Sequence, residues 1–241
     1  TIFIYQIEKN MESQKPKIAM YVKRPFGEKL NASFDFLKEN WKLLLKFITY
    51  LLLPLCLIQA LSLNGLMSGA LSISAIASST AMAASSSSLI AFGSYYGLYM
   101  FLYLIGIILL TSLVYGLIRT YNEREERLQG VTLGMLKPRL FRNIKRLLLM
   151  TGACILLVLF VGIFVGLLVA LTPFTLFLTI PFIIAFSVPL ALLAPIYLFE
   201  DITLMEAFKK TFRLGFATWG GVFLVSLLMG IIANVLQGVT M

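Results

Sequence analysis

The sequence contains no histidine, and charged residues make up only 13% of its 241 positions. The first absence excludes an imidazole general base and a histidine-containing metal site. Both cysteines, Cys56 and Cys154, lie within apolar runs, where a thiol behaves as a small hydrophobic group, so we expect no disulfide between them. No Ser-His-Asp, Cys-His, phosphate-loop or metal-ligand pattern occurs in the sequence. The sequence therefore predicts a protein that is not an enzyme and needs no cofactor.

Charged residues are absent from three long stretches of the chain. These runs extend from Phe47 to Ile118, from Leu147 to Leu198 and from Leu214 to Met241, and they contain 72, 52 and 28 residues. Hydrophobic residues form 59% of the chain, against about 45–50% in soluble domains. Because a membrane-crossing helix needs about 20 apolar residues, the three runs have room for two, two and one such helices.

The basic residues are confined to three segments. All 20 lysines and arginines, which outnumber the carboxylates and give a net charge of +9, fall within residues 9–46, 119–146 and 209–213. This clustering is typical of the positive-inside bias, so it predicts that the three segments and the N-terminus are cytoplasmic. It also favours contact with anionic lipid headgroups. We expect the lipid bilayer to be the partner of these residues and expect no binding of nucleic acid.

We predict an all-α fold: a polytopic membrane helix bundle in a single domain covering residues 21–241, preceded by an N-terminal extension at residues 1–20 without ordered structure. The third and fourth spans are expected to meet in a tight turn around Pro173. The uncharged stretch 64–88 is expected to be a loop, with a small-residue helix packed on the bundle as the alternative. The spans are placed at about 43–63, 91–118, 147–171, 175–198 and 219–239.

Three segments have the pattern of amphipathic helices lying on the cytoplasmic surface, at about residues 30–46, 140–148 and 204–216. In the last one, Thr203 and Glu206 have the spacing of a capping box. The two tryptophans, Trp41 and Trp219, each follow a phenylalanine by seven residues where a surface helix meets a span. A unit of surface helix plus helical hairpin is thus present twice and begins a third time, which predicts a sixth span in the full protein. The expected apolar face of the first helix comprises Leu30, Phe34, Leu37, Trp41, Leu44 and Leu45.

Two features of the predicted spans are candidates for a pocket. Tyr96, Tyr99 and Tyr103 share one face of the second span, where they either line a site for an amphiphile or form hydrogen bonds between helices. Three prolines in the fourth span predict kinks, which either open a site or reflect ordinary packing. The three prolines are Pro181, Pro189 and Pro195. The first two are candidate pocket residues. Pairs of glycines four residues apart also predict close packing within the chain: Gly93 with Gly97 and Gly162 with Gly166.

The remaining candidate residues are cations. Arg124 and Arg127, in the most polar loop, are candidate contacts for a cytoplasmic protein partner. The others are expected to meet lipid headgroups at the membrane surface: Lys38, Lys42, Lys46, Arg142, Lys145, Arg146, Lys209, Lys210 and Arg213.

The stretch "PIYLFEDITLMEAFKKTFRLGFATWGGVFLV" resembles multi-pass bacterial membrane proteins related to the membrane domain attached to some glycerophosphodiester phosphodiesterases. The N-terminal "SFDFLKENWKLLLKF" is similar to the surface helix before the first span of that group. The resemblance implies a six-helix bundle in a bacterial inner membrane, without the separate hydrolase domain. The residues on which it depends are Pro195, Glu200, Glu206, Ala207, Phe212 and Arg213.

These observations favour an accessory, scaffolding or envelope-lipid-related membrane protein of non-catalytic type. A permease subunit is the alternative, with a pathway along the kinked fourth span and the tyrosine face of the second. No aspartate or glutamate lies within a predicted span, and the only lysine, Lys46, stands at the end of the first span, where it can reach the interface. This disfavours proton or sodium coupling through carboxylates.

Overall fold

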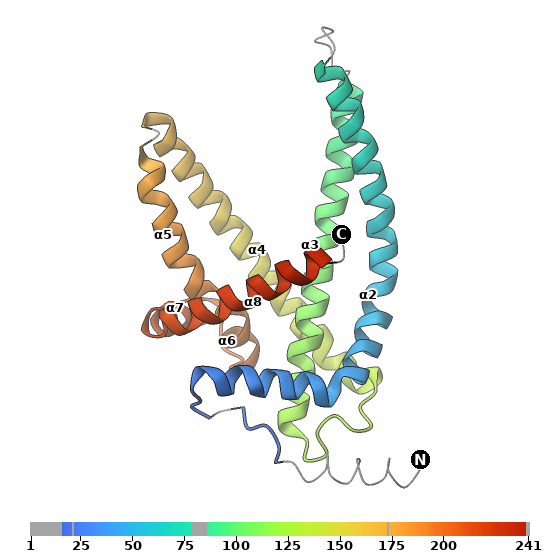
Figure 1. The fold of residues 1–241 in the computed structure, drawn as a ribbon, viewed down its shortest axis with the longest axis vertical. Coiled ribbons are helices and arrows are strands. Elements are labelled where there is room, and N and C mark those ends of the chain that lie inside the picture. Colours follow the sequence, from blue (N-terminus) through green and yellow to red (C-terminus); the bar gives the residue numbers. More distant parts are fainter. Residues whose placement is uncertain (1–15, 21, 79–85, 173, 240–241) are drawn as a thin grey trace. The chain divides into compact units, whose positions relative to one another are not determined.

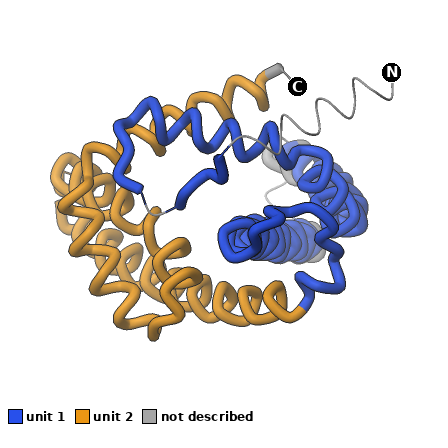
Figure 2. The backbone as a smooth tube through the Cα atoms, turned by 90° about the horizontal axis from the view of Figure 1, so that it is seen from below, with its two compact units in different colours: residues 1–137 blue, residues 138–241 orange. Residues whose placement is uncertain are grey.

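The chain folds into helices that form two compact units, residues 1–137 and residues 138–241 (Figure 2). The computed structural model describes residues 16–20, 22–78, 86–172 and 174–239. Within these ranges, five helices are long and apolar enough to cross a membrane. The all-α fold and the five spans expected from the charge-free runs are therefore confirmed, and the chain is a multi-pass membrane protein by the length and composition of its helices.

The first unit is a hairpin of two long helices, α2 (Phe26–Ser78) and α3 (Ser86–Glu123), which run side by side in Figure 1. Small residues of α2 allow the close approach. A Cβ atom on Gly65 would lie 2.6 Å from the ring of Tyr95, and one on Gly69 would lie 3.4 Å from Phe92. Helices in an apolar environment associate through such small-residue contacts, because hydrophobic burial provides no driving force there.

The expected loop at residues 64–88 was wrong for most of its length. α2 continues as a helix to Ser78, and α3 begins at Ser86, while residues 79–85 lie outside the described residues. The physical reason is that this stretch contains neither a proline nor a charged residue to end the helix, and alanine and leucine are good helix formers. Its two glycines at positions 65 and 69 act as packing positions and not as helix breakers.

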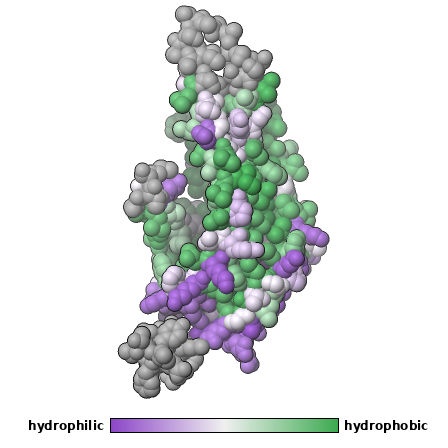
Figure 3. Space-filling view, turned by 90° about the vertical axis from the view of Figure 1, so that its right-hand side faces the viewer, coloured by the Kyte–Doolittle hydropathy of each residue, from purple (hydrophilic) through white to green (hydrophobic). Residues whose placement is uncertain are grey.

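The first part of α2 has the amphipathic pattern and differs in direction from the rest of the helix. Figure 1 shows this part, drawn in dark blue, lying across the foot of the upright part of α2. The surface helix therefore continues directly into the first span, as its sequence pattern predicts. From the side shown in Figure 3, hydrophobic residues cover the upright helices and hydrophilic residues gather below them.

The second unit contains most of α4 (Leu133–Leu171), then α5 (Thr175–Leu190), α6 (Leu193–Phe199), α7 (Leu204–Ala217) and α8 (Trp219–Val239). The short connection between α4 and α5 agrees with the predicted turn, although Pro173 itself is outside the described residues. α7 packs on α5 and α6, and α8 packs on α5.

The fourth span is broken after one of its three prolines, Pro189, whereas Pro181 lies within α5 and Pro195 within α6. It consists of α5 and α6, which are separated by a turn at residues 191–192, two residues after Pro189. Proline has no N–H group, so Pro189 cannot donate a hydrogen bond to the carbonyl of Ala185 four residues earlier. The indole Nε1 of Trp219 donates to that carbonyl instead, at 3.1 Å. A residue at the start of α8 thus supplies the hydrogen bond that the proline removes from α5.

α7 begins with the predicted capping box. The backbone N–H of Glu206 donates to the Thr203 hydroxyl at 3.4 Å, and the backbone N–H of Thr203 donates to the Glu206 carboxylate at 3.1 Å. The Thr203 hydroxyl donates to the same carboxylate at 2.9 Å. These hydrogen bonds hold the pKa of Glu206 below its ordinary value, because they favour the ionised form.

The buried face of α7 differs from the one that its large apolar residues suggest. Ala207, Thr211 and Gly215, four residues apart, are buried, whereas Met205 and Phe216 are exposed. A Cβ atom on Gly215 would lie 2.6 Å from both the Cα and the Cβ atom of Pro189. Small residues are therefore required along this face, because they bring the backbone of α7 against the broken end of α5.

The other glycine pairs were not placed as expected. A Cβ atom built on Gly93, Gly97, Gly162 or Gly166 meets no described atom within 4 Å. The expectation of close packing at these four positions was therefore wrong. The spacing alone is not specific, since a glycine promotes helix contact only where another backbone or ring lies opposite it.

The contact between Gly215 and Pro189 gives a first prediction. We expect Gly215→Ala to destabilise the protein by about 1–3 kcal/mol, because an added methyl group must displace a rigid proline ring. The free energy of unfolding in detergent, followed by circular dichroism, measures this effect. Gly220→Ala is the matched control, because a Cβ atom at Gly220 meets no described atom within 4 Å. Equal stability of the two variants would contradict the packing of α7 on α5.

The hydrogen bond of Trp219 gives a second prediction. We expect Trp219→Phe to cost about 1–3 kcal/mol, because the Ala185 carbonyl is left without a partner in apolar surroundings. Trp41→Phe is the control, since Trp41 is exposed and its indole is assigned no such role. Adding Pro189→Ala restores an N–H donor to α5, so the effect of Trp219→Phe should be smaller in that background. An unchanged effect would rule out the carbonyl as its cause.

Candidate functional site

The surface segment of α2, which we define as residues 26–46, presents an apolar stripe to its surroundings. Three lysines, Lys38, Lys42 and Lys46, are exposed beside this stripe. The ammonium group of Lys42 lies 5.8 Å from the centroid of the Trp41 ring. Leu44, on the edge of the predicted face, is instead buried. The stripe consists of Phe34, Leu37, Trp41 and Leu45, which are between 50% and 59% exposed.

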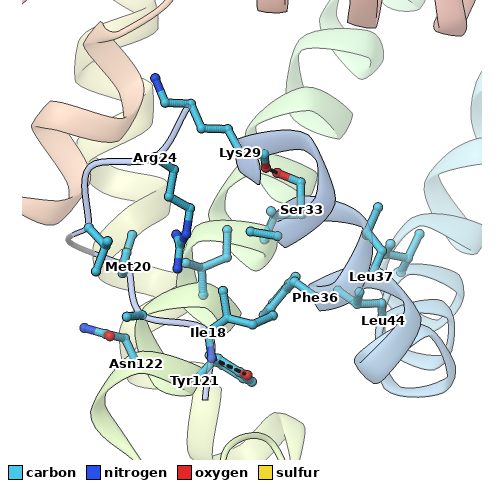
Figure 4. Close-up of a pocket in the computed structure, with 16 residues that line it drawn as sticks. Ile18, Met20, Arg24, Lys29, Ser33, Phe36, Leu37, Leu44, Tyr121 and Asn122 are labelled. Carbon is cyan, nitrogen blue, oxygen red and sulfur yellow. Dashed lines mark hydrogen bonds between the residues drawn. The ribbon is translucent and has the colours of Figure 1, made fainter. Parts of the chain in front are cut away.

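A cavity of about 570 Å³ lies on the face of the surface segment next to this stripe, and Leu37 belongs to both (Figure 4). Its walls come from three parts of the first unit: the N-terminal segment at residues 16–20 and 22–25, α2, and the last turns of α3. Apolar side chains dominate the lining, and Arg24 and Lys29 are its two cations. Apolar contributors from α2 and α3 are Phe36, Leu37, Leu44, Ile48, Val114 and Ile118.

The N-terminal segment is held on α3 by Lys17. Its ammonium group donates to the carbonyl oxygens of Asn122 and Arg124, at 2.6 and 3.1 Å. Because the last carbonyls of a helix have no helical partner, and because a positive charge is favourable at this end, Lys17 caps the C-terminus of α3. The next residue reinforces the attachment, since the N–H of Ile18 donates to the Tyr121 hydroxyl at 3.4 Å.

Tyr121 also connects α3 to the surface segment. Its hydroxyl donates to Oε2 of Glu39 at 3.1 Å, and its ring meets that of Phe36 edge to face with centroids 5.2 Å apart. The other oxygen of Glu39 accepts from Nη1 of Arg127 at 2.9 Å. This ion pair is largely enclosed, with side chains 14% and 23% exposed for Arg127 and Glu39. Glu39 therefore links α2 both to α3 and to the loop that follows α3.

In the second unit, Arg146 of α4 holds the connection between α6 and α7. Its Nη2 atom donates to the carbonyls of Tyr197 and Ile202, at 2.6 and 2.8 Å, and Nη1 donates to Oδ1 of Asp201 at 2.9 Å. The guanidinium also lies over the Tyr197 ring, 4.2 Å from its centroid. Asp201 has a φ of 52°, a conformation that aspartate tolerates better than most residues. The charged residues at 200–206, which interrupt the apolar sequence, thus belong to the connection between α6 and α7 that Arg146 holds in place.

The tyrosines proposed as a pocket lie along α3. Tyr96 and Tyr103 are about half exposed, and Tyr99 is partly buried. Tyr96 stacks on Phe92, with ring centroids 6.3 Å apart. These tyrosines line neither the cavity beside the surface segment nor a shallow hollow between Trp41 and Tyr50 of α2.

The prolines proposed for the same role have different surroundings. Pro181 is exposed on α5, whereas Pro189 is buried against Gly215. Packing against α7 therefore accounts for the surroundings of Pro189.

The predicted surface cations divide into two groups. Arg127, Arg146 and Lys210 form ion pairs within their own units, the last one with Glu200 at 2.6 Å. Arg124 pairs with Glu126 at 3.1 Å, and Arg142 approaches Asp201 to 3.9 Å. Within the described part of the chain, the predicted surface cations that are exposed and form no ion pair are Lys38, Lys42, Lys46, Lys145, Lys209 and Arg213.

Sequence reasoning missed the cavity and the residues that form it. It treated residues 1–20 as an extension, but Lys17 and Ile18 contact α3. The sequence signal is a short apolar run between basic residues, "KIAMYVKR", which precedes the amphipathic pattern. No local periodicity can show that this segment meets the end of a helix about 100 residues later. Among the described residues, no cluster of cysteine or carboxylate side chains has the arrangement of a metal site.

Comparison of the chain with known protein families, with curated proteins and with solved structures finds no match. The resemblance to the phosphodiesterase-associated membrane domains therefore depends on the residues quoted for it alone.

The ion pair between Glu39 and Arg127 gives a third prediction. A double-mutant cycle with Glu39→Gln and Arg127→Gln should give a coupling free energy of about 1.5–3 kcal/mol, the range for hydrogen bonds to charged groups. Thermal or denaturant unfolding in detergent supplies the four stabilities.

The control cycle uses Arg124 and Glu126, whose side chains are 32% and 75% exposed. We expect this pair to couple by about 0–1 kcal/mol, because water screens it. If both cycles gave the same coupling, Glu39 would not be the link between the surface segment and α3.

Proposed function

We propose that the chain is a non-catalytic, accessory protein of the bacterial inner membrane that binds anionic lipid along its cytoplasmic surface. The supporting observation is the apolar stripe of the surface segment, with Lys38, Lys42 and Lys46 beside it. A helix with this arrangement lies in the plane of a bilayer interface, with its apolar side among the acyl chains and its cations at the headgroups. Tryptophan is favoured at the same depth.

The anchoring contacts support this role for the surface segment. Glu39 and Tyr121 hold the segment on α3 at 3.1 Å, and Arg127 adds the enclosed ion pair. The lysines are left to face outward, where each basic residue near an anionic surface contributes about 1 kcal/mol. A rigidly held helix can impose the positions of its three charges on the lipids beside it. This is a scaffolding role towards lipid that requires no chemical step.

The clustering of basic residues is the reason for placing the segment on the cytoplasmic side, together with the N-terminus. The assignment to a bacterial envelope follows from the resemblance of residues 195–213 to the membrane-domain group. Pro189 is less suited to a permease pathway than its sequence suggests, because Gly215 of α7 packs against it.

The proposal gives a fourth prediction, measured on the full chain in nanodiscs of phosphatidylglycerol and phosphatidylcholine. The emission of Trp41, taken as the difference between wild type and Trp41→Phe, should be quenched more by bromine near the headgroup than by bromine near the chain end. An interfacial depth predicts this order. Quenching that is absent, or strongest at the chain end, would contradict an interfacial surface segment.

Lipid composition gives the second measurement of the same prediction. The excess of phosphatidylglycerol recovered with the protein should fall several-fold when Lys38, Lys42 and Lys46 are all replaced by glutamine. Lys23→Gln is the control, because Lys23 is exposed but lies outside the surface segment. An unchanged excess of phosphatidylglycerol in the triple variant would contradict a role of these lysines in lipid binding.

A further inference from the structure

The cavity behind the surface segment has the size and chemistry of a binding site for one lipid chain. Its volume of about 570 Å³ falls within the range of about 300–1,000 Å³ that is common for small-molecule sites. Its apolar lining includes Leu44 and Ile48 of α2 and Val114 and Ile118 of α3. These residues lie where the two predicted spans begin and end, so the cavity adjoins the acyl region of a bilayer.

The cations of the cavity have no counter-charge. Neither an aspartate nor a glutamate contributes to its lining. Among the described residues, Arg24 and Lys29 are assigned no ion pair. Figure 4 shows the Arg24 side chain reaching from the N-terminal segment into the cavity, towards the level of Ile18, while Lys29 extends across the upper edge. Two unpaired cations at the border of an apolar cavity are complementary to an anionic lipid, because the cations match its headgroup and the cavity matches its acyl chain.

We propose that this cavity binds a single anionic phospholipid of the surrounding bilayer, with one acyl chain inside it and the phosphate at Arg24 and Lys29. A guanidinium group is suited to the phosphate, because its planar N–H groups can donate two parallel hydrogen bonds. Of the polar groups in the lining, Ser33 lies beside Lys29 and donates to its backbone carbonyl at 3.0 Å, whereas Tyr121 lies beside Ile18 at the lower end of the cavity in Figure 4. A zwitterionic lipid would bring its own cation to a site that already has two.

The N-terminal segment determines whether the site exists. It supplies Ile18, Ala19, Met20, Val22 and Arg24 to the lining. Lys17 fixes it on the last carbonyls of α3. The site is therefore formed by a contact distant in sequence, and its lipid is distinct from those that meet the lysines on the outer side of the surface segment. The inference depends on the proposed function only in placing this end of the chain at a bilayer surface.

The test uses the delipidated full chain in detergent, titrated with phosphatidylglycerol or phosphatidylcholine and examined by native mass spectrometry. We expect one phosphatidylglycerol per chain to be retained under conditions that remove phosphatidylcholine. Arg24→Gln should lower its retention at least fivefold. Ala32→Trp, which places a large side chain in the lining, should lower it similarly. Lys23→Gln is the matched control, because Lys23 is exposed, lies outside the surface segment and does not line the cavity, and it should leave retention unchanged.

Each other outcome would overturn the proposal. Equal retention of the two lipids by the wild-type protein would contradict a preference for the anionic headgroup. Retention by Arg24→Gln equal to that of wild type would contradict the phosphate site, and an equal loss in Lys23→Gln would make the loss an effect of net charge and not of the cavity. Melting temperatures identify a variant that fails to fold, and the conservative Arg24→Gln remains informative if Ala32→Trp is unfolded. Quenching of Trp41 is a separate readout, so the proposed function can stand when the cavity site fails.

Discussion

Both units depend on the same constraint: backbone carbonyls that lack a helical partner must be satisfied by side chains. In apolar surroundings an unpaired carbonyl is costly. Lys17 satisfies two such groups after α3, and Arg146 satisfies those of Tyr197 and Ile202 beside α6. Trp219 does the same for the carbonyl that Pro189 leaves free. Each of these side chains also joins two elements. The hydrogen bond that satisfies the backbone carbonyl therefore also holds the two elements together.

This constraint explains the charged interruption between the fourth and fifth spans. Residues 200–206 contain the connection from α6 to α7, where the chain changes direction and its carbonyls lose their helical partners. Asp201 and the capping box keep this connection in one conformation, with Arg146 bonded to it from α4. α7 can then lie with its small residues against α5. Without these charged side chains, the carbonyl groups of the connection would have only water or lipid beside them.

The sequence was sufficient for local features and insufficient for distant ones. Charge-free runs located the five spans, and the spacing of Thr203 and Glu206 located the start of α7, because both depend on neighbours along the chain. The continuation of α2 to Ser78 was missed, since uncharged small residues suit either a loop or a packed helix. The cavity was missed altogether, because Lys17 and its acceptor at Asn122 are 105 residues apart. The placement of a glycine opposite a proline is equally invisible to periodicity.

The two sides of the surface segment differ in what they can select. On the outer side, the exposed lysines attract any anionic headgroup. At the cavity, Arg24 and Lys29 border a partly open apolar space, so a ligand must satisfy both charge and chain at once. Glu39 bonds to Tyr121 of α3 and pairs with Arg127, so a shift of the segment at the bilayer surface would disturb the cavity wall. Loading of the outer face and occupancy of the cavity are for that reason expected to be coupled, and by thermodynamic reciprocity the cavity lipid must influence the surface contact equally.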